Sequence, residues 1–288
     1  EGEFLTDVIH TDEGITHYEY DQEGRVLSAT NENGTRYVVN AYDASGRVIC
    51  QTLADGTRQT FEYDDKYRKT IITFGEDGRK EIYEHSDQML VTKITYGDGT
   101  SLSYEYSDQN LRTGQVSRNG CRTLWKYDDH GRQVWEARPD GYELHQEYDE
   151  NHDLVRTWDT DRRETARSYD KEHNLISTRE RIGENQWRET LCRYDEKGGR
   201  VSTRDGLGNE TSRQYEPNRA YPSMVITPKG EETAYEYDRV GRRMSIANTY
   251  GSVHLSYNSR NFVTRRTDGE GYTSRWFYDR MGNLVSYY

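Results

Sequence analysis

One short pattern recurs along the 288-residue chain and limits what it can fold into. A tyrosine, usually followed by an acidic residue, returns roughly every 21 residues, and in its fullest form it opens the motif Tyr-Asp-x-x-Gly-Arg, as in residues 20–25. His85 takes the tyrosine position in one repeat, because residues 83–88 (Tyr-Glu-His-Ser-Asp-Gln) align with residues 104–109 (Tyr-Glu-Tyr-Ser-Asp-Gln). We therefore count thirteen units. A fixed period of this length predicts an array of small, similar supersecondary units.

The Asp-x-x-Gly part of the motif is typical of a tight turn. The aspartate carboxylate can accept the backbone N–H two residues later, and the glycine three residues later can take the left-handed conformation that closes a type I turn with a bulge. We expect structural roles for these repeat positions: Tyr20, Asp21, Gly24, Arg25, Tyr42, Asp43, Gly46, Tyr63, Asp64, His85, Tyr106, Tyr127, Asp128, Gly131, Tyr148, Asp149, Tyr169, Asp170, Tyr194, Asp195, Tyr215, Tyr237, Asp238, Gly241, Tyr257, Tyr278, Asp279 and Gly282.

Some units lack the turn glycine. Asn110 and Asn261 replace it with the residue type that next best tolerates the left-handed conformation. Five units have neither residue, and we expect their turns to be built differently; the positions are Tyr67, Met89, His152, His173 and Arg219.

A second turn signal lies about halfway through each unit. The pairs are Asn33-Gly34, Asp55-Gly56, Asp77-Gly78, Asp98-Gly99, Asn119-Gly120 and Asp140-Gly141. Two turns in each unit imply two strands, and no stretch between the turns is long enough for a helix, except near an insertion at 183–187. The sequence predicts an all-β fold in which residues 1–288 form a single antiparallel β-hairpin array, with no separate effector domain. We expect an open, curved or spiralling strip with unpaired edges near Phe4 and Val285.

The composition predicts an aromatic core. Only 32% of the residues are hydrophobic, yet there are 25 Tyr and 5 Trp, so we expect ring bodies to pack and to form an aromatic ladder from unit to unit. An excess of 51 acidic over 39 basic side chains argues against nucleic acid as a partner. No apolar run is long enough to span a membrane. The chain begins at Glu1 without Met, and we expect it to be a piece of a longer protein.

Candidate chemical sites are few. His145 and Glu147 form the only His-x-Glu pair, but no third ligand is indicated, so we predict no metal there. Cys50, Cys121 and Cys192 form no CxxC motif and are expected to be ordinary thiols. We predict no enzyme activity and no cofactor.

Two repeat features have alternative explanations. The repeated aspartates could bind Ca²⁺, but turn capping uses the same carboxylates without an ion and is preferred. His85 is interpreted as a ring substitution rather than as a catalytic residue. The arginines that follow the turn glycine are expected to stack on neighbouring tyrosine rings; they are Arg25, Arg47, Arg132 and Arg242.

The cadence Gly-x-x-x-x-Tyr-x-Tyr-Asp-x-x-Gly-Arg resembles the YD repeat, also called the RHS repeat, over nearly the whole chain. This repeat occurs in bacterial Rhs and WapA-type polymorphic toxins, insecticidal toxin-complex subunits and animal teneurins. The resemblance implies a β-sheet strip that spirals into a hollow shell, in bacteria usually around a C-terminal toxin, in a protein that is secreted or at the cell surface. Its partners would be neighbouring repeats and the enclosed toxin or other cargo.

The chain also departs from the complete family pattern. The self-cleavage motif Asp-Pro-x-Gly is missing, because no Asp precedes any of the prolines, which are Pro139, Pro217, Pro222 and Pro228. Autoproteolysis and toxin activity are therefore not carried over. Two functions remain, a wall segment of an encapsulating shell, which we prefer, and a recognition module whose aromatic surface binds carbohydrate or a protein partner.

Overall fold

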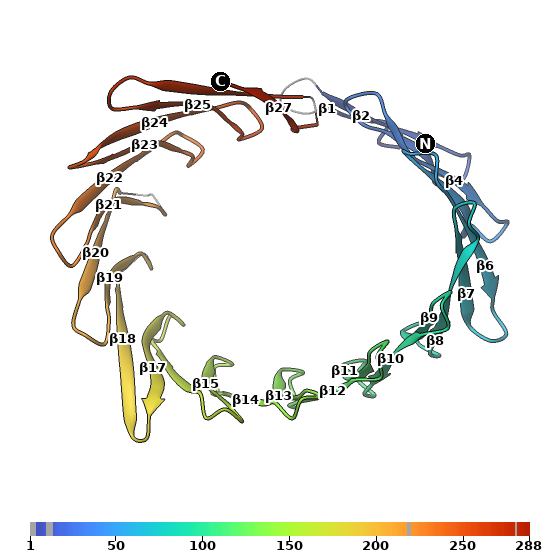
Figure 1. The fold of residues 1–288 in the computed structure, drawn as a ribbon, viewed down its shortest axis with the longest axis horizontal. Coiled ribbons are helices and arrows are strands. Elements are labelled where there is room, and N and C mark those ends of the chain that lie inside the picture. Colours follow the sequence, from blue (N-terminus) through green and yellow to red (C-terminus); the bar gives the residue numbers. More distant parts are fainter. Residues whose placement is uncertain (1–3, 10–13, 218–219, 280) are drawn as a thin grey trace. The chain divides into compact units, whose positions relative to one another are not determined.

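The computed structural model describes residues 4–9, 14–217, 220–279 and 281–288. These residues form 27 antiparallel strands in one open sheet and contain no helix, which confirms the predicted all-β hairpin array. Consecutive strands are joined by short turns (Figure 1). Within the described residues, no helix of the length and hydrophobicity needed to cross a membrane is found.

The chain clusters into two compact units. The first unit comprises Glu1–Leu124 and Tyr278–Val285, and the second comprises Trp125–Phe277 and Ser286–Tyr288. The strands that begin in the first stretch are β1 (Asp7–Ile9), β2 (Ile15–Tyr20), β3 (Val26–Thr30), β4 (Arg36–Tyr42), β5 (Val48–Leu53), β6 (Arg58–Asp64), β7 (Lys69–Phe74), β8 (Arg79–His85), β9 (Val91–Thr95), β10 (Ser101–Tyr106), β11 (Arg112–Val116) and β12 (Arg122–Tyr127).

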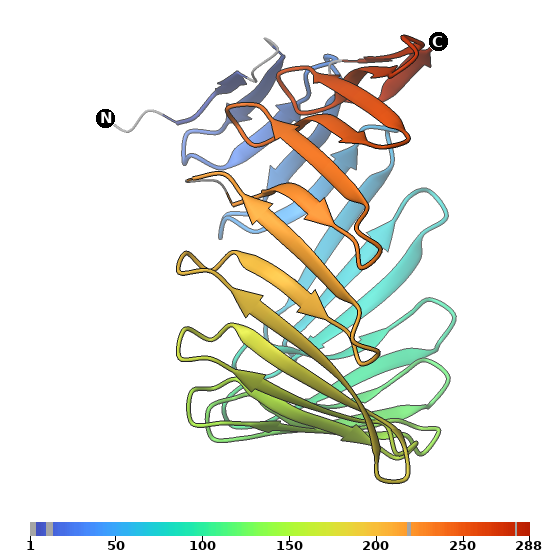
Figure 2. The same cartoon turned by 90° about the vertical axis from the view of Figure 1, so that its left-hand side faces the viewer.

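The remaining strands are β13 (Gln133–Ala137), β14 (Glu143–Tyr148), β15 (Leu154–Asp159), β16 (Glu164–Tyr169), β17 (Leu175–Gly183), β18 (Gln186–Tyr194), β19 (Arg200–Arg204), β20 (Glu210–Tyr215), β21 (Pro222–Ile226), β22 (Glu232–Tyr237), β23 (Arg243–Asn248), β24 (Gly251–Tyr257), β25 (Val263–Asp268), β26 (Thr273–Tyr278) and β27 (Leu284–Tyr287). Figure 2 shows the yellow and orange hairpins of the second unit following one another in chain order, with turns at both edges of the sheet.

The turn after each repeat tyrosine, here called the tyrosine turn, has the predicted bulge in most units. At the β14–β15 turn, Glu147 pairs with Arg156 but Tyr148 pairs with Leu154, so one residue is skipped. At the β2–β3 turn, the Gly24 N–H donates to the Asp21 carbonyl at 3.1 Å, and Gly24 has a φ of 80°. This left-handed conformation is the reason for glycine at that position.

The prediction that units without Gly or Asn have different turns is wrong at three positions. Met89, His152 and His173 have φ values of 62°, 71° and 64°, and their N–H groups donate to the carbonyls of Ser86, Asp149 and Asp170 just as the glycines do. The turn hydrogen bonds therefore hold even side chains with a Cβ in the left-handed region, at a cost of about 1–2 kcal/mol each.

The other two exceptions have different outcomes. The turn that contains Tyr67 is built differently, as predicted, because β6 and β7 pair without a register shift as far as Asp64 and Lys69. Arg68, not Tyr67, has the left-handed conformation there, with a φ of 51°. Arg219 lies outside the described residues.

The insertion near 183–187 is a longer hairpin. Strands β17 and β18 have nine residues each, and Asn185 turns the chain between them with a φ of 57°. The helix that the sequence left open at this place does not form.

The sheet has almost no buried core. Among the described residues, Ala29 is the only buried hydrophobic residue, and no large side chain is fully buried. The expectation of a core made of packed rings is therefore wrong, because the rings are only partly buried. A sheet buries its side chains only when another layer covers it. The repeat tyrosines of this single sheet are accordingly half-buried, as Tyr42 and Tyr148 are.

Candidate functional site

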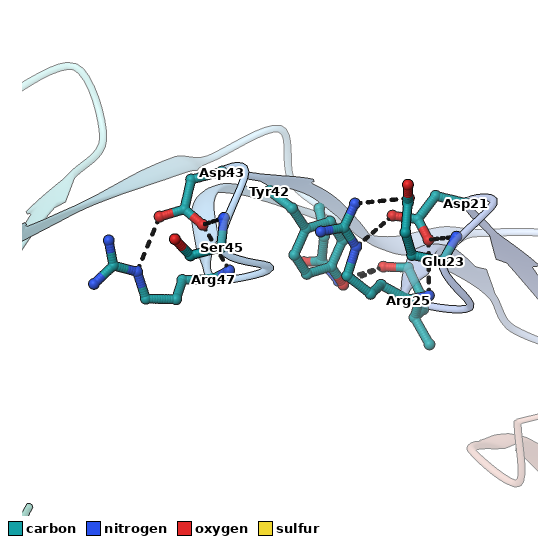
Figure 3. Close-up of polar contacts among 9 residues, drawn as sticks. Asp21, Glu23, Arg25, Tyr42, Asp43, Ser45 and Arg47 are labelled. Carbon is teal, nitrogen blue, oxygen red and sulfur yellow. Dashed lines mark hydrogen bonds and ion pairs between the residues drawn. The ribbon is translucent and has the colours of Figure 1, made fainter.

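The tyrosine turn is the most regular polar arrangement in the molecule, and its first part is the aspartate carboxylate. At the β2–β3 turn, Asp21 Oδ1 accepts hydrogen bonds from the N–H groups of Glu23 at 3.0 Å and Arg25 at 2.9 Å, and Oδ2 accepts one from Arg25 Nε at 2.6 Å (Figure 3). The same three kinds of bond recur at the pairs Asp43–Arg47, Asp128–Arg132 and Asp238–Arg242. Both carboxylate oxygens of these aspartates are therefore occupied without an ion.

These donors stabilise the charged form of the aspartates. Hydrogen bonds from the Arg47 backbone N–H and guanidinium hold the pKa of the Asp43 carboxyl below its usual range. Where asparagine replaces arginine, the Asn174 side chain and N–H lower the pKa of Asp170 in the same way.

The second part of the turn is the tyrosine hydroxyl, which connects the strand that ends in the tyrosine to the strand before it. The Tyr42 hydroxyl donates a 2.6 Å hydrogen bond to the carbonyl of Val26, the first residue of β3. In the described part of the chain, nine further tyrosines donate to a carbonyl 14 to 19 residues earlier: Tyr20, Tyr63, Tyr106, Tyr148, Tyr169, Tyr194, Tyr215, Tyr237 and Tyr257.

The strand register explains why a carbonyl is available at this place. Strands β3 and β4 pair from Ser28 and Val39 to Thr30 and Arg36, so the register stops short of Val26. The tyrosine side chain reaches across this end of the strand pair, and its hydroxyl supplies a donor that the neighbouring backbone does not.

His85 makes the equivalent contact in its unit. Its Nδ1 lies 3.1 Å from the Arg68 carbonyl, and because a carbonyl only accepts, Nδ1 carries the proton in this contact. The structure thus places this ring where the repeat places a tyrosine. A purely structural role for His85 and for the other repeat positions stays a prediction.

The third part of the turn is the arginine, which the sequence predicted to stack on tyrosine. The guanidinium of Arg25 lies 4.8 Å from the centre of the Tyr42 ring (Figure 3), and Arg47, Arg132 and Arg242 lie 4.4 to 5.1 Å from the rings of Tyr63, Tyr148 and Tyr257. The expected ladder of rings in direct contact is therefore wrong for these units, because an arginine covers the ring face that would meet the previous tyrosine.

The other candidate residues lie in separate surroundings. His145 stacks on Trp158 with ring centres 5.0 Å apart, whereas the Glu147 carboxylate lies 3.9 Å from the Arg156 guanidinium. Cys50, Cys121 and Cys192 are free thiols. The arginine-to-aspartate bond and the hydroxyl-to-carbonyl bond were not predicted; the recurring five-residue spacing from Tyr to Arg is the sequence signal that could have indicated them.

Comparisons with known proteins give matches only among solved structures. No family model and no curated protein matches the sequence. The crystal structure titled TcdB2-TccC3-TEV is 12% identical with a TM-score of 0.42 and matches 95% of this chain over 20% of its own length. The Photorhabdus luminescens Tc holotoxin pore is 13% identical with a TM-score of 0.35 and matches 95% of this chain over 23% of its own length.

A third match is of another kind. A porin-like protein from Bacteroides uniformis is 12% identical with a TM-score of 0.30, and the match covers 75% of this chain and 92% of that protein. The chain thus spans about a fifth of the length of the toxin structures it matches. At these TM-scores the likeness is loose, and no function or partner is transferred from it.

Proposed function

We propose that this chain is a wall segment of a YD-repeat shell, that its role is mechanical enclosure, and that it is not an enzyme. The observation that carries the proposal is the recurring bond from a repeat tyrosine hydroxyl to the backbone of the preceding strand, for example from Tyr148 to the Gln133 carbonyl at 3.2 Å. The most regular polar groups of the molecule thus join each repeat strand to the strand before it. The repeat resemblance in the sequence supports the same proposal.

In a shell, the enclosed partner would be a toxin or other cargo, and the complete protein would be secreted or displayed at the cell surface. The present chain would be one stretch of the wall in a single repeat array, and neighbouring repeats would cover its terminal strands.

The test uses the longest natural protein that contains this sequence. We expect limited proteolysis to spare any segment held inside the shell, and to cut that segment rapidly once Tyr148, Tyr169 and Tyr237 are all changed to alanine. Equal cleavage in both proteins would contradict enclosure. The present chain expressed alone in a sensitive host should not arrest growth; arrest that a single substitution abolishes would show that it is an effector.

Recognition of carbohydrate remains the alternative prediction. Sugar rings stack on exposed aromatic faces, but the guanidiniums of Arg47 and Arg132 cover one face of Tyr63 and Tyr148. The tyrosine turns therefore do not favour this function. Specific retention of one glycan class on a glycan array would support it.

A further inference from the structure

One tyrosine turn has a glycine at the position where an arginine completes several of the others. The position five residues after the repeat tyrosine is occupied, in chain order, by Arg25, Arg47, Arg68, Leu90, Leu111, Arg132, Asp153, Asn174, Gly199, Ala220, Arg242, Phe262 and Asn283. Gly199 is thus the single glycine in the series.

Units with an arginine define what this position can bind. Arg132 donates from Nε to Asp128 Oδ2 at 2.7 Å, and its guanidinium lies 4.6 Å from the centre of the next tyrosine ring, Tyr148. Arg25 makes the same two contacts with Asp21 and Tyr42. A carboxylate oxygen and a tyrosine face together therefore form a slot for one guanidinium.

Other units fill the space over the tyrosine with a ring. Phe4 stacks on Tyr20 with ring centres 5.2 Å apart, and Tyr221 stacks on Tyr237 at 5.3 Å. Coverage of the tyrosine face by a cation or a ring thus recurs along the array.

At Gly199 the carboxylate and the tyrosine ring of the slot are present, but no arginine side chain from the described part of the chain lies between them. Asp195 Oδ1 accepts the N–H groups of Lys197 at 2.9 Å and Gly199 at 2.8 Å, as in every complete turn. Its Oδ2 accepts no hydrogen bond from the described residues, and none of their cationic or aromatic side chains lies against the Tyr215 ring. The Tyr215 hydroxyl is held by the Arg200 carbonyl at 3.1 Å, which fixes the ring.

A cavity of about 480 Å³ opens between these groups. Its lining includes the Asp195 turn, Tyr215 and two further acidic residues, Glu196 and Glu216. Lys197 also lines the cavity, but its ammonium forms no ion pair with Asp195.

We propose that this cavity binds a guanidinium group supplied by another molecule, in the place that arginine fills in the complete turns. The group is planar, stacks on an aromatic ring and donates to a carboxylate in a fixed geometry, whereas an ammonium offers only a point charge. The source is either an arginine side chain of a partner protein or a small guanidinium compound.

Calorimetry and amide NMR test the proposal with two probes. N-acetyl-arginine-methylamide represents a protein side chain, and agmatine represents a free guanidinium compound. We expect a Kd of about 1 mM for at least one probe, with shifts centred on the Gly198 and Gly199 amides. The stronger probe identifies the source. The lysine analogue should bind several-fold more weakly, and the neutral citrulline analogue should not bind. Equal affinity for arginine and citrulline analogues would overturn the proposal.

Matched variants locate the binding. Asp195→Asn keeps an acceptor for the turn N–H groups but removes the charge, and should weaken binding about tenfold or more. Asp149→Asn makes the same change in a turn that ends in Asp153, and should leave binding unchanged. Loss of binding in both variants, or in neither, would contradict the site.

Gly199→Arg provides a second test that does not remove a turn residue. A Cβ at this position would come within 2.8 Å of Asp195 Oδ2, so the carboxylate must rotate slightly, and the Asp21–Arg25 turn shows that such a turn accommodates an arginine. This variant should abolish probe binding and raise the melting temperature. Arg219→Ala should bind like the parent chain; binding that is seen only in Arg219→Ala would mean that the chain fills the slot itself, and the proposal would fail.

Discussion

The strand pair β13–β14, which ends at Tyr148, and the strand pair β7–β8, which follows the unbulged β6–β7 turn and ends at His85, are closed by different hydrogen bonds. Around Tyr148, β13 and β14 pair over three residues, from Trp135 and His145 to Ala137 and Glu143, and the tyrosine hydroxyl reaches the carbonyl of Gln133 beyond the end of that register. Around His85, β7 and β8 pair over six residues, from Lys69 and Glu84 to Phe74 and Arg79.

The difference shows what the tyrosine contributes. Where the backbone ladder is nearly complete, the His85 N–H itself donates to the Arg68 carbonyl at 3.0 Å, and the ring nitrogen is a second donor to the same oxygen. Where the ladder stops early, the tyrosine hydroxyl provides the bond. A side chain thus replaces backbone pairing where the pairing between the strands is short.

Acid should separate the bulged turns from the unbulged β6–β7 turn most strongly, because it acts on many turns at once. Hydrogen bonds lower the pKa values of Asp43, Asp170 and Asp205 in the folded chain. A lowered folded-state pKa contributes stability above the unfolded pKa, near 4, and this stability is lost as the pH falls through the folded value. We therefore expect hydrogen exchange below pH 4 to accelerate first in the bulged turns that an aspartate caps. Among the described residues, only the Tyr67 N–H donates to Asp64, so faster acid opening of its turn than of the others would contradict the account.

Removing a ring should cost more where the ring alone reaches the earlier carbonyl than where a backbone N–H also bonds to it. Tyr148→Ala should lower the free energy of unfolding by about 2 kcal/mol, because the ring is half-buried and carries the bond to Gln133. His85→Ala should lower it by about 1 kcal/mol, because the backbone bond to Arg68 remains. Urea denaturation measures both changes, and an equal or larger loss for His85→Ala would break the comparison.

Removing the arginine should have a smaller effect. Arg132→Ala loses the stack on Tyr148 and the bond to Asp128, and should cost about 1 kcal/mol. A double-mutant cycle with Tyr148→Ala measures the coupling between the two side chains. Additive losses would show that the stacked geometry contributes nothing to stability.

Introducing a glycine should have the smallest effect and the opposite sign. Met89 has a φ of 62°, so Met89→Gly should raise the free energy of unfolding by about 0.5–1 kcal/mol. Tyr67→Gly is the matched control, because the left-handed residue of that turn is Arg68, and it should bring no gain. A gain in the control but not at Met89 would reverse the assignment of the turns.

The sequence predicted the repeats, the strands and most turns, because Asp-x-x-Gly and Asn-Gly are local signals that act within four residues. It predicted the arginine stacks from the same spacing. It did not predict the left-handed Met89, His152 and His173, because their conformation depends on turn hydrogen bonds that override the preference of the residue.

The tyrosine-to-carbonyl bond and the cavity beside Gly199 also could not be predicted from the sequence. Both depend on how each strand pairs with its neighbours. The β13–β14 pairing stops short of Gln133 and leaves its carbonyl available, and this is visible only once the strands are paired. The half-buried state of Tyr148 has the same origin, since composition does not reveal whether a second layer covers a sheet.

The most direct test of the account is the stability of Tyr148→Phe, which removes one hydroxyl and leaves the ring in place. The account holds that this hydroxyl joins β14 to β13 through the Gln133 carbonyl, so the variant should lose about 1 kcal/mol in the free energy of unfolding, with faster amide exchange in β13 and β14. Unchanged stability together with unchanged exchange would show that the tyrosines act only through their rings, and would contradict the central claim.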